Sequence, residues 1–365
     1  SLPPSTKMIL AIADQHAISL GPIPSKESLP PSTKMILAIA DQHAISLGPI
    51  PSKELRDNVR RMAVSLLACG VDPNRTLLFR QSSVPQIAQL SWILGSLQTV
   101  SRLQRLTQYK EKASKFSHRN IPLGLLIYPV LQAADVLMFK ATHVPVGADQ
   151  AQHMNLLVDI AENFNMHYQS SYFPLPIQAT HVPVGADQAQ HMNLLVDIAE
   201  NFNMHYQSSY FPLPIQVTRP VLSRVRSLRN PTKKMSKSEA SGKSRIEIND
   251  SPDEIEEKCR KAISDNDAKL SYNFEMRPGV SNLIDIYCAI TETKISSVVE
   301  GGWNQLELKM QLCKAIEKKF CPIRDKLMKL EQSSEADDIL SDGDKKARSI
   351  AQKNLDEIQS IVGFS

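Results

Sequence analysis

The sequence predicts an α/β protein whose first part is a parallel β-sheet with covering helices and whose last part is all-helical. Two observations carry this prediction. Between residues 35 and 79 a short apolar run, an amphipathic stretch and a second short apolar run follow one another, which is the order of a strand–helix–strand crossover unit. After Arg245 the strand signals fade and helical periodicities remain.

Two pairs of identical segments interrupt this pattern. Residues 1–27 recur without a substitution as residues 28–54, and residues 141–178 recur as residues 179–216. Solenoid repeats share one period, drift in sequence and need about three copies or more. We therefore interpret these pairs as duplicated coding segments and expect one copy of each to serve the fold. Removing 27 and 38 residues from the 365 leaves 300, the size of a two-domain protein.

Each predicted element has its own signal. Residues 35–40 (MILAIA) form a continuous apolar run that ends in Asp41, which is typical of a buried parallel strand. Residues 55–69 carry apolar side chains at helical spacing and are closed by Gly70. The next strand is predicted at residues 76–79 (TLLF), helices at residues 85–97, 101–113 and 149–164, and a further strand at residues 141–146.

The helical part opens with a capping box. Ser251 stands three residues before Glu254, and Pro252 occupies the first helical position, so a helix is predicted to start here. Further helices are predicted at residues 281–291, 306–320 and 344–362.

Composition narrows the class of protein. The chain has 42 Lys and Arg against 38 Asp and Glu and is 42% hydrophobic, which is ordinary for a soluble globular protein. No apolar run approaches the ~20 residues that cross a bilayer, so no membrane insertion is expected. The five cysteines form no C-x-x-C pair, which favours a reducing compartment. Asp149 and His153 have metal-ligand spacing, but they lack further Cys or His partners, so no metal site is predicted.

The sharpest chemical signal is the sequence KMSKS at residues 234–238. Between residues 217 and 246 there are nine Lys or Arg and a single acid, Glu239, with Pro231 and Gly242 marking a loop. Such a basic loop can close on a triphosphate and stabilise the charge that develops during displacement at phosphorus. Residues 241–244 (SGKS) look like the tail of a Walker loop, but Lys237 stands where that loop needs glycine.

KMSKS is a signature of the class I aminoacyl-tRNA synthetases, and the chain resembles their tryptophanyl family in its bacterial or mitochondrial form. The matching segments, besides KMSKS, are residues 40–47 (ADQHAISL), 66–73 (LLACGVDP), 89–95 (QLSWILG), 126–139 (LIYPVLQAADVLMF) and 143–156 (HVPVGADQAQHMNL). The resemblance implies a Rossmann-like catalytic domain at residues 28–246, preceded by the duplicated segment 1–27, and a helical anticodon-binding domain at residues 247–365. It implies that tryptophan and ATP form tryptophanyl adenylate, from which the tryptophanyl group passes to tRNA(Trp).

The resemblance also assigns a tryptophan pocket. Asp135 would accept the indole N–H, and Gln132, Tyr128, His43 and Val146 would shape the slot around it. Indole has one hydrogen-bond donor on a large apolar ring system. A single carboxylate in an aromatic and aliphatic slot is therefore enough to recognise it. A phenylalanine would leave that acceptor unpaired, which discriminates against it.

ATP would be held by two segments. Gly147 would allow close backbone approach to adenosine. The implied ATP-binding residues are Gly147, Ala148, Asp149, Val225, Lys234, Met235, Ser236, Lys237 and Ser238, with Lys234 and Lys237 as the catalytic pair. Gly185, Ala186 and Asp187 are the same residues in the second copy. We favour the first copy because it follows Asp135 closely along the chain. Mg²⁺ is expected to enter with ATP rather than at a protein metal site.

Partners and location follow from the same resemblance, which implies tRNA(Trp), a homodimer and the mitochondrial matrix, or the cytoplasm if the protein is bacterial. Residues 101–120 hold six Lys or Arg and a single acid, and they predict a solvated face, a contact with the tRNA acceptor end or dimer packing. We find no match to the H-I-G-H signature that binds ATP phosphates in this class. We therefore expect this chain to be weakly active or inactive, and the alternative is a non-catalytic isoform that binds tRNA or dimerises.

Overall fold

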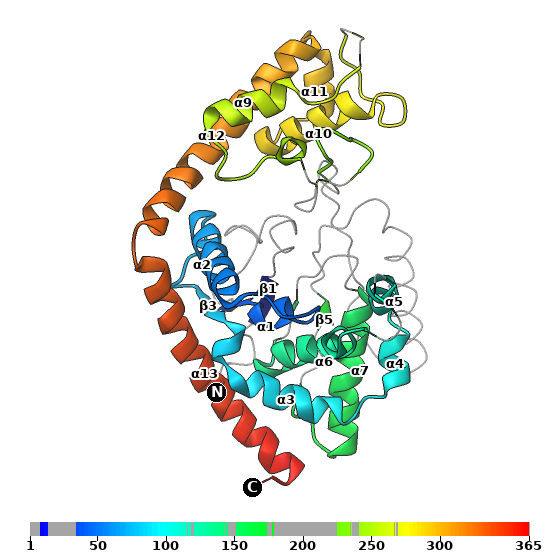
Figure 1. The fold of residues 1–365 in the computed structure, drawn as a ribbon, viewed down its shortest axis with the longest axis vertical. Coiled ribbons are helices and arrows are strands. Elements are labelled where there is room, and N and C mark those ends of the chain that lie inside the picture. Colours follow the sequence, from blue (N-terminus) through cyan, green and yellow to red (C-terminus); the bar gives the residue numbers. More distant parts are fainter. Residues whose placement is uncertain are drawn as a thin grey trace, which may run out of the picture. The chain divides into compact units, whose positions relative to one another are not determined.

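A computed structural model describes residues 8–13, 34–114, 116–117, 120–141, 143–144, 151–173, 177–178, 225–233, 235, 241–265, 267 and 269–364 (Figure 1). The chain forms two compact units, one from Ser1–Val182 together with Leu330–Ser365 and the other from Pro183–Lys329. We call them the first and the second unit. They are defined by compactness, and the functional ranges 28–246 and 247–365 remain predictions.

In the described part of the chain, the first unit contains a five-stranded sheet in the order β3–β2–β1–β4–β5, with every pair parallel. The strands are Met8–Ala13 (β1), Lys34–Ile39 (β2), Thr76–Arg80 (β3), His143–Val144 (β4) and Ile177–Gln178 (β5). The parallel sheet confirms the predicted fold class.

The two copies of the first repeat both enter this sheet. β1 and β2 carry the same apolar run and pair along their whole length, from Met8 with Lys34 to Ala13 with Ile39. The expectation that one copy would serve the fold is therefore wrong for this repeat. Identical apolar runs suit a buried parallel strand equally well, so each copy occupies a sheet position of its own.

The second repeat contributes differently. Its first copy supplies β4, the helix α7 (Ala151–His167) and β5. Its second copy, residues 179–216, lies outside the described residues. The strand predicted at residues 141–146 is thus limited to two residues in the described part of that stretch, and the helix predicted at residues 149–164 is confirmed as α7.

Helices cover the sheet of the first unit. They are α1 (Asp41–Ala44), α2 (Ser52–Ala68), α3 (Pro85–Gly95), α4 (Val100–Gln104), α5 (Thr107–Ala113), α6 (Leu123–Met138), α7 and α13 (Glu335–Val362). The helices predicted at residues 55–69 and 85–97 are confirmed as α2 and α3. The single helix predicted at residues 101–113 is wrong. Leu106 has an extended conformation (φ −58°, ψ 132°), which ends α4 and starts α5.

The largest core cluster of the described residues lies between one face of the sheet and the helices α3, α6, α7 and α13. Ile36 and Ala38 of β2 belong to it, whereas Leu37 and Ile39 are equally buried but lie outside it. This alternation is the two-residue period of a strand whose two faces are both covered. α6 contributes most of its length, including the buried Asp135.

The last helix of the chain, α13, returns to the first unit and packs on β3 (Figure 1). At Gly343 the approach is so close that an added Cβ would lie 1.8 Å from the carbonyl oxygen of Leu78. Glycine is therefore required here by backbone contact. β3 ends the strand order in the described sheet, so α13 covers a strand edge that would otherwise offer unpaired backbone groups.

The next residue of α13 satisfies that edge chemically. Asp344 is buried, and its Oδ1 accepts the backbone N–H of Arg80 at 2.8 Å. Its Oδ2 accepts Nε of Arg80 at 2.8 Å and the hydroxyl of Ser83 at 3.0 Å. Arg348, one turn further, donates to the carbonyl of Ser83 at 2.7 and 2.9 Å. The turn that follows β3 is thus held by the far end of the chain.

The second unit is helical in its described part. It contains α9 (Pro252–Arg260), α10 (Pro278–Thr291), α11 (Ile295–Glu300) and most of α12 (Gln305–Glu331). The predicted capping box is confirmed. Ser251 Oγ accepts the N–H of Glu254 at 3.3 Å, and Glu254 accepts the N–H of Ser251 at 2.8 Å. Among the helices of the described residues, we find none that is both long and apolar enough to cross a membrane.

Candidate active site

The candidate site lies in the first unit, where two neighbouring parallel strands end. Asp41 and His43 follow β2, and Gln81 and Ser82 follow β3. The carboxyl ends of neighbouring parallel strands meet at one edge of a sheet, which is where open α/β sheets bind ligands. Ser82 donates its N–H to Asp41 Oδ1 at 2.8 Å and its hydroxyl to Asp41 Oδ2. This contact joins the two strand ends.

A buried carboxylate from α6 lies against these strand ends. Asp135 is 1% exposed, and Gln81 Nε2 donates to both of its oxygens, at 2.8 Å to Oδ1 and 2.9 Å to Oδ2. His43 Nε2 lies 3.0 Å from Oδ2. Gln81 is fully buried, and its Oε1 accepts the backbone N–H of His43 at 3.3 Å. The three residues therefore form one hydrogen-bonded group.

The environment of Asp135 sets its charge. Burial is the largest effect and raises the pKa of the carboxyl above its ordinary value, and the hydrogen bonds from His43 and Gln81 oppose part of that rise. The two donors thus favour the ionised form, which is the form that accepts hydrogen bonds on both oxygens.

Most of the predicted tryptophan pocket is brought together. Tyr128, Gln132 and Asp135 are spaced by four and three residues on α6, so they share one face of the helix. The Tyr128 ring meets the His43 ring edge-on, with centroids 6.4 Å apart. Lys112 Nζ lies 5.0 Å from the Tyr128 centroid. The fifth predicted pocket residue, Val146, lies outside the described residues.

The predicted ATP-binding residues are described in part. Gly147, Ala148, Asp149, their second copies Gly185, Ala186 and Asp187, and the KMSKS residues Lys234, Ser236, Lys237 and Ser238 lie outside the described residues. Val225 and Met235 are described, in the second unit. The N–H of Met235 donates to the carbonyl of Val225 at 3.0 Å, so the two ends of this segment are paired. We call residues 225–233 and 235 the loop foot.

The loop foot is attached to the core of the second unit. Asn282 of α10 is 2% exposed, accepts the N–H of Arg226 at 3.2 Å and donates to the carbonyl of Arg226 at 3.2 Å. The Arg226 guanidinium stacks on Phe274 at 3.7 Å from the ring centroid. Met235 packs against the same core, which includes Leu228. The loop foot, next to the KMSKS sequence, is therefore hydrogen-bonded to and packed on this core.

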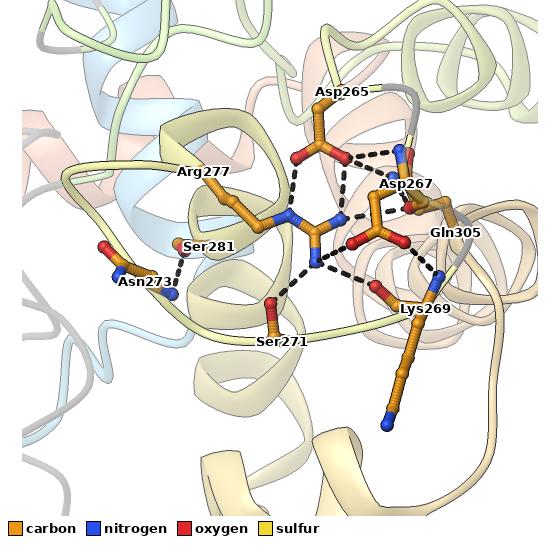
Figure 2. Close-up of polar contacts among 8 residues, drawn as sticks. All are labelled: Asp265, Asp267, Lys269, Ser271, Asn273, Arg277, Ser281 and Gln305. Carbon is orange, nitrogen blue, oxygen red and sulfur yellow. Dashed lines mark hydrogen bonds and ion pairs between the residues drawn. The ribbon is translucent and has the colours of Figure 1, made fainter.

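The start of α10 is itself fixed by a polar cluster around Arg277 (Figure 2). The guanidinium binds both oxygens of Asp265 at 2.6 and 2.7 Å, the carbonyl of Lys269 at 2.8 Å and the hydroxyl of Ser271 at 2.7 Å. Arg277 lowers the pKa of Asp265 to about 2. Gly279 follows at a point where a Cβ would lie 2.5 Å from the Ile263 carbonyl. These contacts hold the helix that carries Asn282.

Sequence reasoning missed two buried amides, Gln81 at the candidate site of the first unit and Asn282 beside the loop foot of the second unit. Gln81 is separated from Asp135 by 54 residues and Asn282 from Arg226 by 56 residues, so no local pattern reveals either contact. A usable signal existed for Gln81, because it comes two residues after the parallel strand predicted at residues 76–79, much as Asp41 follows the strand predicted at residues 35–40. Among the described residues, no group of three His, Cys, Asp or Glu side chains is placed to hold a metal ion.

Comparisons with known proteins agree on one family. A family model described as tRNA synthetases class I (W and Y) matches residues 19–180 and again residues 174–320. The mitochondrial tryptophan–tRNA ligase of Caenorhabditis elegans is 50% identical over 357 residues, which cover 98% of this chain and 81% of that protein. The tryptophan–tRNA ligase of Bacillus anthracis is 36% identical over 315 residues, which cover 85% and 83%. The mitochondrial ligase of Dictyostelium discoideum is 34% identical over 314 residues, which cover 85% and 73%.

Solved structures agree in fold. The tryptophanyl-tRNA synthetase of Campylobacter jejuni complexed with ADP and tryptophan has a TM-score of 0.71 at 24% identity, covering 98% of this chain and 99% of its own. The enzyme from Mycoplasma pneumoniae has a TM-score of 0.70 at 24% identity, covering 98% and 97%. The names of these relatives do not favour the alternative of a non-catalytic isoform.

Proposed function

The chain belongs to the class I tryptophanyl-tRNA synthetases, and from that premise we propose that the group around Asp135 selects tryptophan for activation by ATP. In the first step the tryptophan carboxylate attacks the α-phosphate of magnesium ATP and releases pyrophosphate. In the second step the tryptophanyl group passes from the adenylate to the terminal ribose of tRNA(Trp). The Campylobacter relative, whose structure is a complex with ADP and tryptophan, supports these two small substrates.

The observation that carries this proposal is the buried, hydrogen-bonded carboxylate of Asp135 at the carboxyl ends of β2 and β3. Its Oδ1 has one donor among the described residues, Gln81, while Oδ2 has two, Gln81 and His43. A carboxylate offers about four acceptor positions, so Oδ1 can accept the indole N–H. Tyr128 and Gln132 on the same face of α6 would border the indole ring.

ATP binding is assigned to the residues that the family resemblance implies. Gly147, Ala148, Asp149 and Val225 contact adenosine, and Lys234 and Lys237 stabilise the pyrophosphate side with Met235, Ser236 and Ser238 in the same loop. This arrangement needs positioned charge more than proton transfer, as is general for reactions at phosphorus. The fixed loop foot supports the assignment, because one end of the basic loop is attached to a rigid core. Magnesium enters as part of the substrate.

The test is tryptophan-dependent exchange of labelled pyrophosphate into ATP. It is run with the purified chain as it stands and with a version that carries a nucleotide-binding segment from a bacterial relative. Exchange in either version that is abolished by Asp135→Asn supports the proposal. Exchange in neither version, or exchange that Asp135→Asn leaves unchanged, contradicts it.

Dimerisation is supported by exposed apolar side chains on two packed helices. Trp92 of α3 is 82% exposed, and Leu123 and Ile127 of α6 are 68% and 45% exposed. Large exposed apolar side chains of this kind mark interaction surfaces, and the homodimer buries them. Sedimentation velocity should give a dimer for the chain and a monomer for Trp92→Glu. A monomeric parent chain would overturn this part of the proposal.

The tRNA and the compartment complete the assignment. Residues 247–365 contact the anticodon. In the basic stretch 101–120, Arg102 pairs with Asp159 and Lys112 lies over Tyr128, so these two side chains already have partners within the first unit. The mitochondrial matrix is supported by the two relatives named as mitochondrial ligases. The location is tested by expressing the tagged protein from its complete transcript and measuring whether it is imported into mitochondria.

A further inference from the structure

The amide of Gln81 has a fixed orientation. Its Oε1 accepts the backbone N–H of His43 at 3.3 Å, so its Nε2 must face the carboxylate of Asp135. The reversed amide would place an oxygen against two carboxylate oxygens and would leave a buried N–H without its acceptor, which costs about 1–3 kcal/mol. The backbone of His43 therefore decides which end of Gln81 meets Asp135.

The backbone of Gln81 is fixed as well. It begins the short 3₁₀ turn Gln81–Ser83 after β3, and it is fully buried. Ser82 donates to Asp41, and Ser83 donates to Asp344 of α13. Since the two residues after Gln81 are bonded to two different elements, the backbone that carries this side chain cannot shift without breaking those bonds.

Gln81 also differs from His43 in how it binds the carboxylate. Its Nε2 is nearly equidistant from Oδ1 and Oδ2, whereas His43 contacts Oδ2. The amide therefore holds both carboxylate oxygens from one side and leaves acceptor positions on Oδ1 for a further donor. Because the amide is neutral, it supports the negative charge without cancelling it.

We propose that Gln81 is a positioning and specificity-determining residue, which orients the Asp135 carboxylate so that Oδ1 accepts an indole N–H. The inference rests on the tryptophan pocket proposed above and deepens it. Burial raises the pKa of Asp135, and Gln81 opposes that rise. Without Gln81 the carboxyl would hold a proton at higher pH, and a protonated carboxyl is a poorer acceptor for the N–H that distinguishes tryptophan.

The test compares the binding of tryptophan with that of 3-benzothienylalanine, in which sulfur replaces the indole N–H. Isothermal titration calorimetry on the full chain gives both dissociation constants over a pH series. Gln81→Met, which matches the side chain in size and removes its hydrogen bonds, should weaken tryptophan about tenfold or more and the analogue less than about threefold. The acid limb of tryptophan binding, by which we mean the loss of affinity as the pH falls, should also move to higher pH. Loss of packing alone does not cause such a shift.

The chain offers a matched control. Gln86 is also a buried amide of the first unit, 6% exposed, and it donates to Gln352 at 2.7 Å, away from Asp135. Gln86→Met should leave the ratio of the two dissociation constants and the acid limb unchanged. If Gln81→Met does not fold in a thermal-unfolding assay, Gln81→Glu replaces it. The second carboxylate should move the acid limb in the same direction.

Asp135→Asn distinguishes a failure of the proposed tryptophan pocket from a failure of the proposed role of Gln81. If it leaves the ratio for tryptophan and the analogue as it is in the parent chain, the proposed pocket itself is wrong. If Asp135→Asn abolishes the ratio while Gln81→Met changes neither the ratio nor the acid limb, the pocket stands and the role of Gln81 is overturned.

Discussion

Two buried amide side chains, Gln81 in the first unit and Asn282 in the second, hold different kinds of group. Gln81 donates to a carboxylate and accepts from a backbone N–H, whereas Asn282 binds the N–H and the carbonyl of one residue, Arg226. Gln81 thus orients a charged side chain, whereas Asn282 holds a segment of backbone. Loss of Gln81 should therefore change selectivity and pH dependence, and loss of Asn282 should change the position of the loop foot.

The two units also differ in how they are built. The second unit is one continuous stretch, Pro183–Lys329, whereas the first needs the last helix of the chain to complete it. Asp344 of α13 holds Ser83, which follows Gln81 by two residues. The support for one amide is thus contributed from the far end of the sequence, and the support for the other is local.

The largest expected effect tests the support from α13. Gly343→Ala places a Cβ 1.8 Å from the Leu78 carbonyl, so the helix must move away from β3. We expect a loss of about 3 kcal/mol in the unfolding free energy of the first unit, since overpacking against backbone cannot be relieved by a rotamer change. Hydrogen exchange with peptide resolution should show faster exchange at β3 and unchanged exchange at α10.

The control for this prediction is Lys345→Ala, at an exposed position on the same helix. It should leave exchange at β3 unchanged. Weaker tryptophan binding in Gly343→Ala would link the helix to the pocket, whereas unchanged exchange at β3 would show that the close contact is not needed.

An intermediate effect is expected at the loop foot. Asn282→Leu keeps the size of the side chain but leaves the N–H and the carbonyl of Arg226 without their partner, which costs about 2 kcal/mol in the second unit. The Michaelis constant for ATP should rise and the one for tryptophan should stay constant. Asn249→Leu, at an exposed position of the same unit, is the control. Equal changes in the Michaelis constants for ATP and tryptophan would contradict a specific effect of Asn282 on the loop foot.

The smallest effect is expected at Asp285, a carboxyl that is only partly buried, whereas Asp135 is fully buried. Burial raises the pKa of Asp285 to about 6, and its hydrogen-bond donor is the hydroxyl of Tyr272 at 3.4 Å. A folded pKa above the unfolded value of about 3.9 means that stability is highest at low pH and falls as pH rises between these values. Because this carboxyl is partly exposed, we expect the loss to be about 1 kcal/mol between pH 4 and pH 7.

Asp285→Asn should remove this pH dependence and leave the second unit more stable than the parent at pH 7. Tyr272→Phe should extend the fall to higher pH, because it removes a hydrogen bond that lowers the pKa of Asp285. Urea unfolding of the second unit at several pH values measures both changes. A parent chain whose stability rises from pH 4 to pH 6 in this unit would contradict the assignment.

The sequence was informative where one local signal decides the structure. The capping box at Ser251 and the strand–helix–strand order up to residue 80 depend on neighbours, and both were confirmed. α6 escaped prediction because it is apolar almost all round and contains Pro129, so it shows no clear helical period. α13 was predicted as a helix, but its return to β3 depends on Gly343 fitting a distant carbonyl. Such long-range contacts cannot be predicted from the residues next to them in the sequence.

The docking of α13 on β3 has a consequence for biosynthesis. β3 leaves the ribosome well before the helix that covers its edge, since all of the second unit must be translated in between. At ~5–20 residues per second this interval is on the order of ten seconds. During that time the backbone groups of Leu78 and Arg80 that contact α13 in the folded chain are open to pairing with other strands.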